Sequence, residues 1–126
     1  MPIPRFHIPG VILGDGIAPR KDPRIVSQID MAPTLLSLMG ISADYPMLGK
    51  DLTRMPADWP GRAIMQYDKN FALMRGRDVV IQQPERAPEG FIYEDATETL
   101  TPAQQPDTMK DTALGLVLWG SLAYQQ

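Results

Sequence analysis

The chain has 126 residues, and 44% of them are hydrophobic, which is typical of a folded domain rather than a disordered tail. Its 12 basic and 15 acidic residues are scattered and give a net charge of −3, so the sequence offers no basic face for nucleic acid. The sequence has no cysteine, which excludes thiolate chemistry, and no stretch approaches the roughly 20 apolar residues of a membrane span. We therefore expect the chain as given to be soluble.

The first predicted element is a strand over residues 8–13, with the sequence IPGVIL. A short continuous apolar run of this kind is typical of a strand that is buried on both faces of a parallel sheet. The later strands look antiparallel, so we expect the neighbours of this strand to lie upstream of Met1. The chain is therefore interpreted as a piece of a longer protein.

A helix is predicted over residues 31–39. Its apolar face consists of Ala32, Leu35, Leu36 and Met39. Asp30 is the predicted N-cap, which puts Pro33 in the first turn, where its missing N–H is not needed. Gly40 is predicted to end the helix in the left-handed conformation.

The apolar period changes to two after Gly61, which predicts a four-stranded antiparallel meander. The strands are expected at residues 62–67, 71–74, 78–82 and 91–94. Turn signals separate them at residues 68–70, 75–77 and 84–90.

A last helix is predicted to begin with Asp107 or Thr108 as its cap and to run to about Tyr124. One apolar stripe consists of Met109, Ala113, Leu116, Val117, Gly120 and Tyr124. A second stripe on the far side consists of Leu114, Leu118 and Leu122. A helix that is apolar on both sides needs cover on both sides, or it exposes a patch that drives association.

The candidate catalytic residues each have a simpler structural explanation. His7 is the sole histidine and has no ligand partner in sequence, so we interpret it as a side chain at the edge of the first strand. Residues 14–16, Gly-Asp-Gly, lack a phosphate-loop pattern and indicate a turn. Asp30 could be a metal ligand, but its position before a helix favours a cap.

The remaining candidates are a threonine and three arginines. Thr34 could serve as a nucleophile, but no base or metal ligand is identifiable near it, so a place inside the helix is favoured. Arg62, Arg75 and Arg77 could contact an anionic substrate, but strand alternation favours a solvated face. The eight methionines are interpreted as core filler. We therefore predict no catalytic, cofactor-binding or metal-binding residue in this chain.

The order of motifs resembles the end of sulfatase-family proteins of the alkaline phosphatase superfamily. The specific part is SQIDMAPTLLSLMGI at residues 27–41, which is similar to the post-catalytic segment of lipoteichoic acid synthases and membrane-bound phosphoglycerol transferases. The "IP" strand at residues 8–13, residues 49–52, residues 61–67 and the last helix also fit this resemblance.

The resemblance implies an α/β core with one divalent metal, manganese or zinc, a threonine nucleophile and an Asp-His pair before the "IP" strand. No Asp-His dipeptide occurs in this sequence, so no catalytic or metal residue can be transferred to it. The implied parent is a metal-dependent transferase or hydrolase that is anchored in the inner membrane, with this part facing the periplasm or cell exterior. A true sulfatase or a phosphoethanolamine transferase is the alternative parent.

The expected fold is α+β, a partial alkaline-phosphatase-like fold. Residues 1–60 are predicted to be the C-terminal end of the sulfatase-like core, and residues 61–126 a small antiparallel sheet with a terminal helix, packed with the first part as one unit. The expected partner is the N-terminal catalytic portion of the same protein, and the chain alone is expected to be inactive and to form homodimers. The alternative is an interaction module that docks a partner through its apolar helix face and unpaired strand.

Overall fold

A computed structural model describes residues 1–42, 44 and 46–125 of the chain. The helical elements are two short 3₁₀ turns, η1 (Ile3–Phe6) and η2 (Gln28–Asp30), and two α-helices, α1 (Met31–Leu38) and α2 (Asp107–Tyr124). The strands are β1 (Ala63–Tyr67), β2 (Asn70–Arg75), β3 (Asp78–Gln82), β4 (Glu89–Glu94) and β5 (Thr99–Pro102). The predicted α+β class is confirmed. No described helix combines the length and apolar content that a bilayer span requires.

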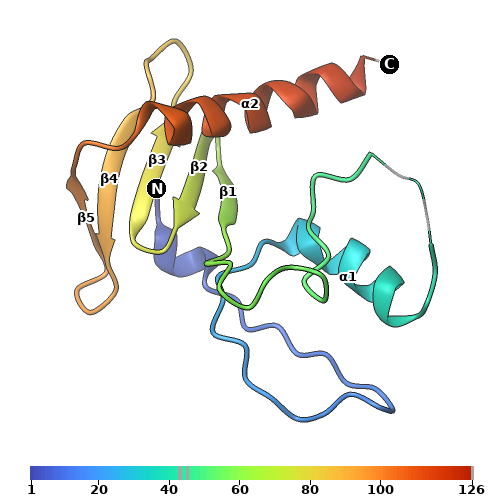
Figure 1. Cartoon of the computed structure of the whole chain (residues 1–126). Coiled ribbons are helices and arrows are strands. Elements are labelled where there is room, and N and C mark those ends of the chain that lie inside the picture. Colours follow the sequence, from blue (N-terminus) through green and yellow to red (C-terminus); the bar gives the residue numbers. More distant parts are fainter. Residues whose placement is uncertain (43, 45, 126) are drawn as a thin grey trace.

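Within the described residues, the strands form one antiparallel sheet in the order β1-β2-β3-β4-β5 (Figure 1). The hairpin between β2 and β3 turns at Gly76, whose positive φ of 58° suits a residue without a side chain. The predicted meander is confirmed, but the prediction of four strands missed β5. This edge strand has one half-buried apolar residue, Leu100, and ends at Pro102, so it lacks the alternating pattern of a core strand.

The two faces of the sheet are covered by different parts of the chain. On one face Leu73 and Val80 pack against Met109 and Ala113 of α2. On the other face the N-terminal turn η1 covers the sheet through Ile3, which belongs to a second cluster. The buried sheet residues of that cluster are Met65, Ala72, Val79, Ile81 and Tyr93. Alternate residues along each strand thus pack into two separate hydrophobic clusters, one on each face of the sheet.

The predicted strand at residues 8–13 is not formed. Val11 is 76% exposed and Leu13 is 89% exposed, and no described strand pairs with this segment. A strand requires a neighbour for its backbone N–H and C=O groups, and Pro9 and Gly10 further weaken the run. The segment is therefore an extended apolar loop in this chain (Figure 1).

Helix α1 ends as predicted at Gly40, which has a φ of +69°. The backbone N–H of Ile41 donates to the carbonyl of Leu36 at 2.9 Å, and that of Gly40 donates to Ser37 at 3.0 Å. This pair of bonds is the Schellman motif. Asp30 occupies the predicted N-cap position of α1, but its side chain makes no capping bond to that helix.

Helix α2 begins at Asp107 after Pro106, and neither Asp107 nor Thr108 caps it with a side-chain hydrogen bond, contrary to the prediction. Its first half lies across the sheet, and its second half extends beyond β1 (Figure 1). The far stripe is exposed as predicted, with Leu114, Leu118 and Leu122 at 39%, 50% and 61%. Of the stripe that faces the sheet, Met109 and Ala113 are buried, whereas Tyr124 is 94% exposed.

Candidate functional site

The most organised polar site in the described residues surrounds Asp30, whose side chain is completely buried. Asp30 is the last residue of η2, which follows Ser27 and leads directly into α1. Its carboxylate forms an ion pair with Arg62, in which Nη1 lies 3.1 Å from both Oδ1 and Oδ2. Arg62 is 7% exposed, so the pair is sequestered from water.

Backbone groups complete the environment of this ion pair. The N–H of Ser27 donates to Asp30 Oδ2 at 2.9 Å, and the N–H of Lys50 donates to Oδ1 at 2.7 Å. Arg62 also donates from Nη2 to the carbonyl of Leu48 at 2.8 Å. Both carboxylate oxygens are thus held by charge-assisted bonds, which are the stronger kind.

Ser27 joins this site to the edge of the sheet. Its hydroxyl donates to the carbonyl of Arg62 at 3.0 Å and accepts from the N–H of Ile64 at 2.9 Å. The hydroxyl therefore satisfies the first backbone groups of β1 where a neighbouring strand would otherwise do so. Only glycine fits at position 61, because a Cβ there would lie 1.9 Å from the carbonyl oxygen of Ile25.

Thr34 joins the same site to the chain after α1. Its hydroxyl donates to the carbonyl of Asp30 at 2.6 Å and accepts from the N–H of Leu52 at 3.0 Å. The predicted place inside the helix is confirmed, and Thr34 is 2% exposed. Both hydrogen-bonding directions of this hydroxyl are used structurally, so it is not poised as a nucleophile.

We define the clasp as Ser27, Asp30, Thr34 and Arg62. The prediction that placed Arg62 on a solvated face was wrong, because its charge is neutralised by a buried carboxylate 32 residues earlier. The sequence prediction missed the clasp as a site. The spacing of Ser27 and Asp30, which matches the first and last positions of a capping box, is the signal that could have indicated it.

The other candidate residues lie outside the clasp. His7 is exposed, and residues 15–16 form the predicted turn, with a φ of +76° at Gly16. Arg75 and Arg77 are exposed as predicted, and Arg77 forms an ion pair with Glu94 at the surface. Among the described residues, no group of three or more histidine, aspartate or glutamate side chains could hold a metal ion.

A second ion pair lies near the clasp. Arg24 donates to the carboxylate of Asp22, and this hydrogen bond lowers the pKa of Asp22 to about 2. Arg24 also donates from Nη2 to the carbonyl of Leu52 at 3.2 Å. The pair therefore adds a contact to the segment that the clasp already holds.

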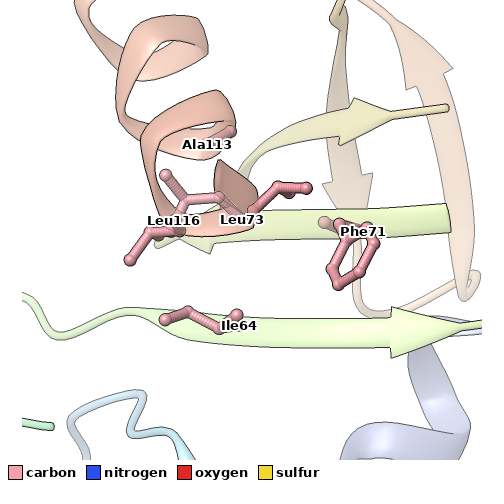
Figure 2. Close-up of a pocket in the computed structure, with 7 residues that line it drawn as sticks. Ile64, Phe71, Leu73, Ala113 and Leu116 are labelled. Carbon is pink, nitrogen blue, oxygen red and sulfur yellow. The ribbon is translucent and has the colours of Figure 1, made fainter. Parts of the chain in front are cut away.

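An apolar cavity of about 90 Å³ lies between α2 and the β1 edge of the sheet (Figure 2). Its lining consists of Ile64, Phe71, Ala72, Leu73, Ala113, Leu116 and Val117. Ligand pockets usually exceed about 300 Å³, and this lining has no charged group to bind a phosphate or sulfate ester. The cavity is thus an unfilled space beside the last buried turn of α2.

A larger hollow of about 470 Å³ lies where β4 and β5 meet the start of α2. Glu89 and Lys110 are the charged residues in its lining, and they have opposite signs. It therefore presents no convergent set of cations for an anionic substrate.

Comparison with known proteins identifies the fold. No known family model matches the chain. One solved crystal structure matches it with a TM-score of 0.92 and 42% sequence identity, over 99% of this chain. The chain therefore has a fold like that of the alkaline phosphatase superfamily, to which the matched protein is assigned. That protein comes from Vibrio parahaemolyticus, and this chain spans 31% of its length.

Proposed function

We propose that this chain is the supporting, non-catalytic part of a larger metal-dependent enzyme of the alkaline phosphatase superfamily. The observation that carries the proposal is the match to the Vibrio protein, which extends over 99% of this chain but 31% of that protein. An identity of 42% over the same backbone favours a common role for the matched segments. By this account, the chemistry belongs to the other two thirds of such a protein.

The donor set of the chain supports this assignment. A divalent metal of the kind the superfamily resemblance implies needs several converging oxygen or nitrogen ligands. The described residues do not fit such a metal, because they contain no suitable group of ligands and Asp30 is already saturated by Arg62 and backbone N–H groups. Thr34 is likewise occupied by Asp30 and Leu52.

The exposed apolar surface supports the expected partner, which is the catalytic portion of the same protein. Leu118 and Leu122 on α2 are at least half exposed, as are Val11 and Leu13 in the extended loop. Soluble monomers seldom leave such apolar groups uncovered over a contiguous area. In the proposed whole protein, the catalytic portion covers the α2 stripe and supplies a neighbour for residues 8–13.

The proposed activity is transfer of phosphoglycerol or hydrolysis of a phosphate or sulfate ester. Its support is the resemblance of residues 27–41 to phosphoglycerol transferases, and in this structure those residues form η2 and α1 and contribute three members of the clasp. A parent anchored in the inner membrane, with this part outside the cytoplasm, and a manganese or zinc ion in that parent complete the proposal. A sulfatase or a phosphoethanolamine transferase remains the alternative within the same superfamily.

The second candidate function is an interaction module. The exposed α2 stripe favours it, because such a stripe could bind a separate partner protein as well as a covalently linked one. The reading frame upstream of Met1 discriminates the two functions: an Asp-His-Gly motif shortly before it supports the enzyme, and a stop codon supports the module.

A chimera tests the proposed supporting role. The matching segment of the Vibrio protein is replaced by this chain, and unfolding is followed by calorimetry. We expect one cooperative transition, because the chain should pack on the rest of that protein as the native segment does. Two separate transitions, or a chimera that does not fold, would contradict the proposal.

Substitutions in the α2 stripe sharpen this test. Leu118→Asp combined with Leu122→Asp should lower the melting temperature of the chimera by several degrees. In the isolated chain, measured at a concentration low enough to keep it monomeric, the same exposed sites should shift the free energy of unfolding by no more than about 0.5 kcal/mol each. Ile92→Asp, at an exposed apolar site on β4, is the control and should have a small effect in both proteins.

A further inference from the structure

Helix α1 is attached to the sheet in an unusual way. In the described part of the chain, neither hydrophobic cluster contains a residue between positions 7 and 62. Thr34 is the buried residue of α1, whereas Leu35, Leu38 and Met39 are exposed. Figure 1 shows α1 outside the sheet, on the side of β1. Apolar burial in these clusters therefore does not hold α1 to the sheet.

The contacts that do hold it converge on the start of β1. Ser27 contacts the backbone of Arg62 and Ile64, and Asp30 and Leu48 both contact the Arg62 side chain. Ile25 adds one isolated parallel bridge to Gly61. The Arg62 side chain connects η2 and residues 48–52 to the start of β1, and the Ser27 hydroxyl adds a second side-chain link just before η2.

The clasp also holds its own parts together. Lys50 and Leu52 donate to Asp30 and Thr34, so residues 48–52 lie against η2 and the first turn of α1. Gly49 allows this close approach, because a Cβ there would lie 1.9 Å from the carbonyl oxygen of Ile29. These segments therefore form one packed unit, which we define as the clasped unit: η2, α1 and residues 48–52.

We infer that the clasp is a conformational latch, and that the clasped unit opens from the sheet as one piece while both hydrophobic clusters stay closed. Proteins open locally in contiguous units whose free energies lie below that of global unfolding. If one partner of a buried ion pair moves away, the other charge is left buried and unpaired, which is strongly destabilising. The latch should therefore be either fully closed or open to water.

Hydrogen exchange of the whole chain tests this inference, with mass spectrometry resolving the peptides. In the wild-type chain, amides of α1 should be protected but should exchange through an opening with weak urea dependence. Amides of β2 and β3 should exchange through global unfolding, which exposes more surface and depends strongly on urea.

The variant Arg62→Met removes the connecting charge and keeps a long side chain. Peptides from the clasped unit should then exchange roughly a hundredfold faster, while β2 and β3 keep their wild-type rates. Arg77→Met is the matched control, because Arg77 forms an exposed ion pair outside the clasp. It should leave both sets of peptides unchanged.

The wild-type measurement alone can overturn the inference. If α1 and β2 amides exchange with the same rate and urea dependence, the chain is one cooperative unit. If α1 amides show no protection at all, the clasp does not hold the unit closed. Equal acceleration of the clasped unit and the sheet by Arg62→Met would also contradict it.

Discussion

Tyr93 lies on the sheet face that η1 covers, and it is 6% exposed. Burial raises the pKa of its phenol above the usual 10.0, and the nearby charges of Asp95 and Glu98 raise it further. The folded chain therefore keeps this proton to a higher pH than the unfolded chain does. Above pH 10 the unfolded state binds fewer protons, so stability falls as pH rises through the folded pKa.

The variant Tyr93→Phe should remove this alkaline loss. We expect its free energy of unfolding to fall less than that of the wild type as pH rises above 10, as measured by urea unfolding. Tyr67→Phe, at an exposed site on β1, serves as the control and should behave like the wild type. Parallel pH profiles for the wild type and Tyr93→Phe would contradict this account.

The burial of Arg62 could not be predicted from the residues next to it in the sequence. Its position before an alternating strand favours a solvated side chain, and that rule is correct for Arg75 and Arg77. Arg62 differs because Asp30, 32 residues earlier, is brought beside it by the fold. A partner at that separation leaves no periodic signal in the sequence.

Among the elements, those with strong apolar periodicity could be predicted from sequence and the others could not. The helix ends at Leu38 and Tyr124 and the strands β1 to β4 follow from their patterns and turn residues. The strand β5 escaped because an edge strand needs few apolar residues. The run at residues 8–13 has the pattern of a strand, but a strand also depends on a neighbour, which the pattern does not specify.

Helix α2 has the clearest consequence for association. Its exposed stripe at Leu114, Leu118 and Leu122 should bind a second copy when no other partner covers it. Sedimentation should show the isolated chain as a dimer or a larger species at high concentration. The double variant Leu118→Gln and Leu122→Gln should sediment as a monomer, whereas the control Ile92→Gln should still associate. A clean wild-type monomer would count against this expectation.

For the whole molecule, the order of the predicted elements is enough to predict the α+β class. It does not predict the clasp. The candidate residues His7, Asp30 and Thr34 were each assigned structural roles from their neighbours in sequence. The structure places Asp30 and Thr34 in one buried network and leaves His7 exposed, so no described site joins all three. Contacts between distant segments made that network, and these are what local sequence patterns omit.

The central claim is that the chemistry of the proposed enzyme resides outside this chain, and titration calorimetry with manganese and zinc tests it most directly. We predict no stoichiometric uptake of either ion at micromolar affinity, because the described carboxylates form no ligand group and Asp30 is bound to Arg62. Uptake of one ion per chain with micromolar affinity would contradict the claim.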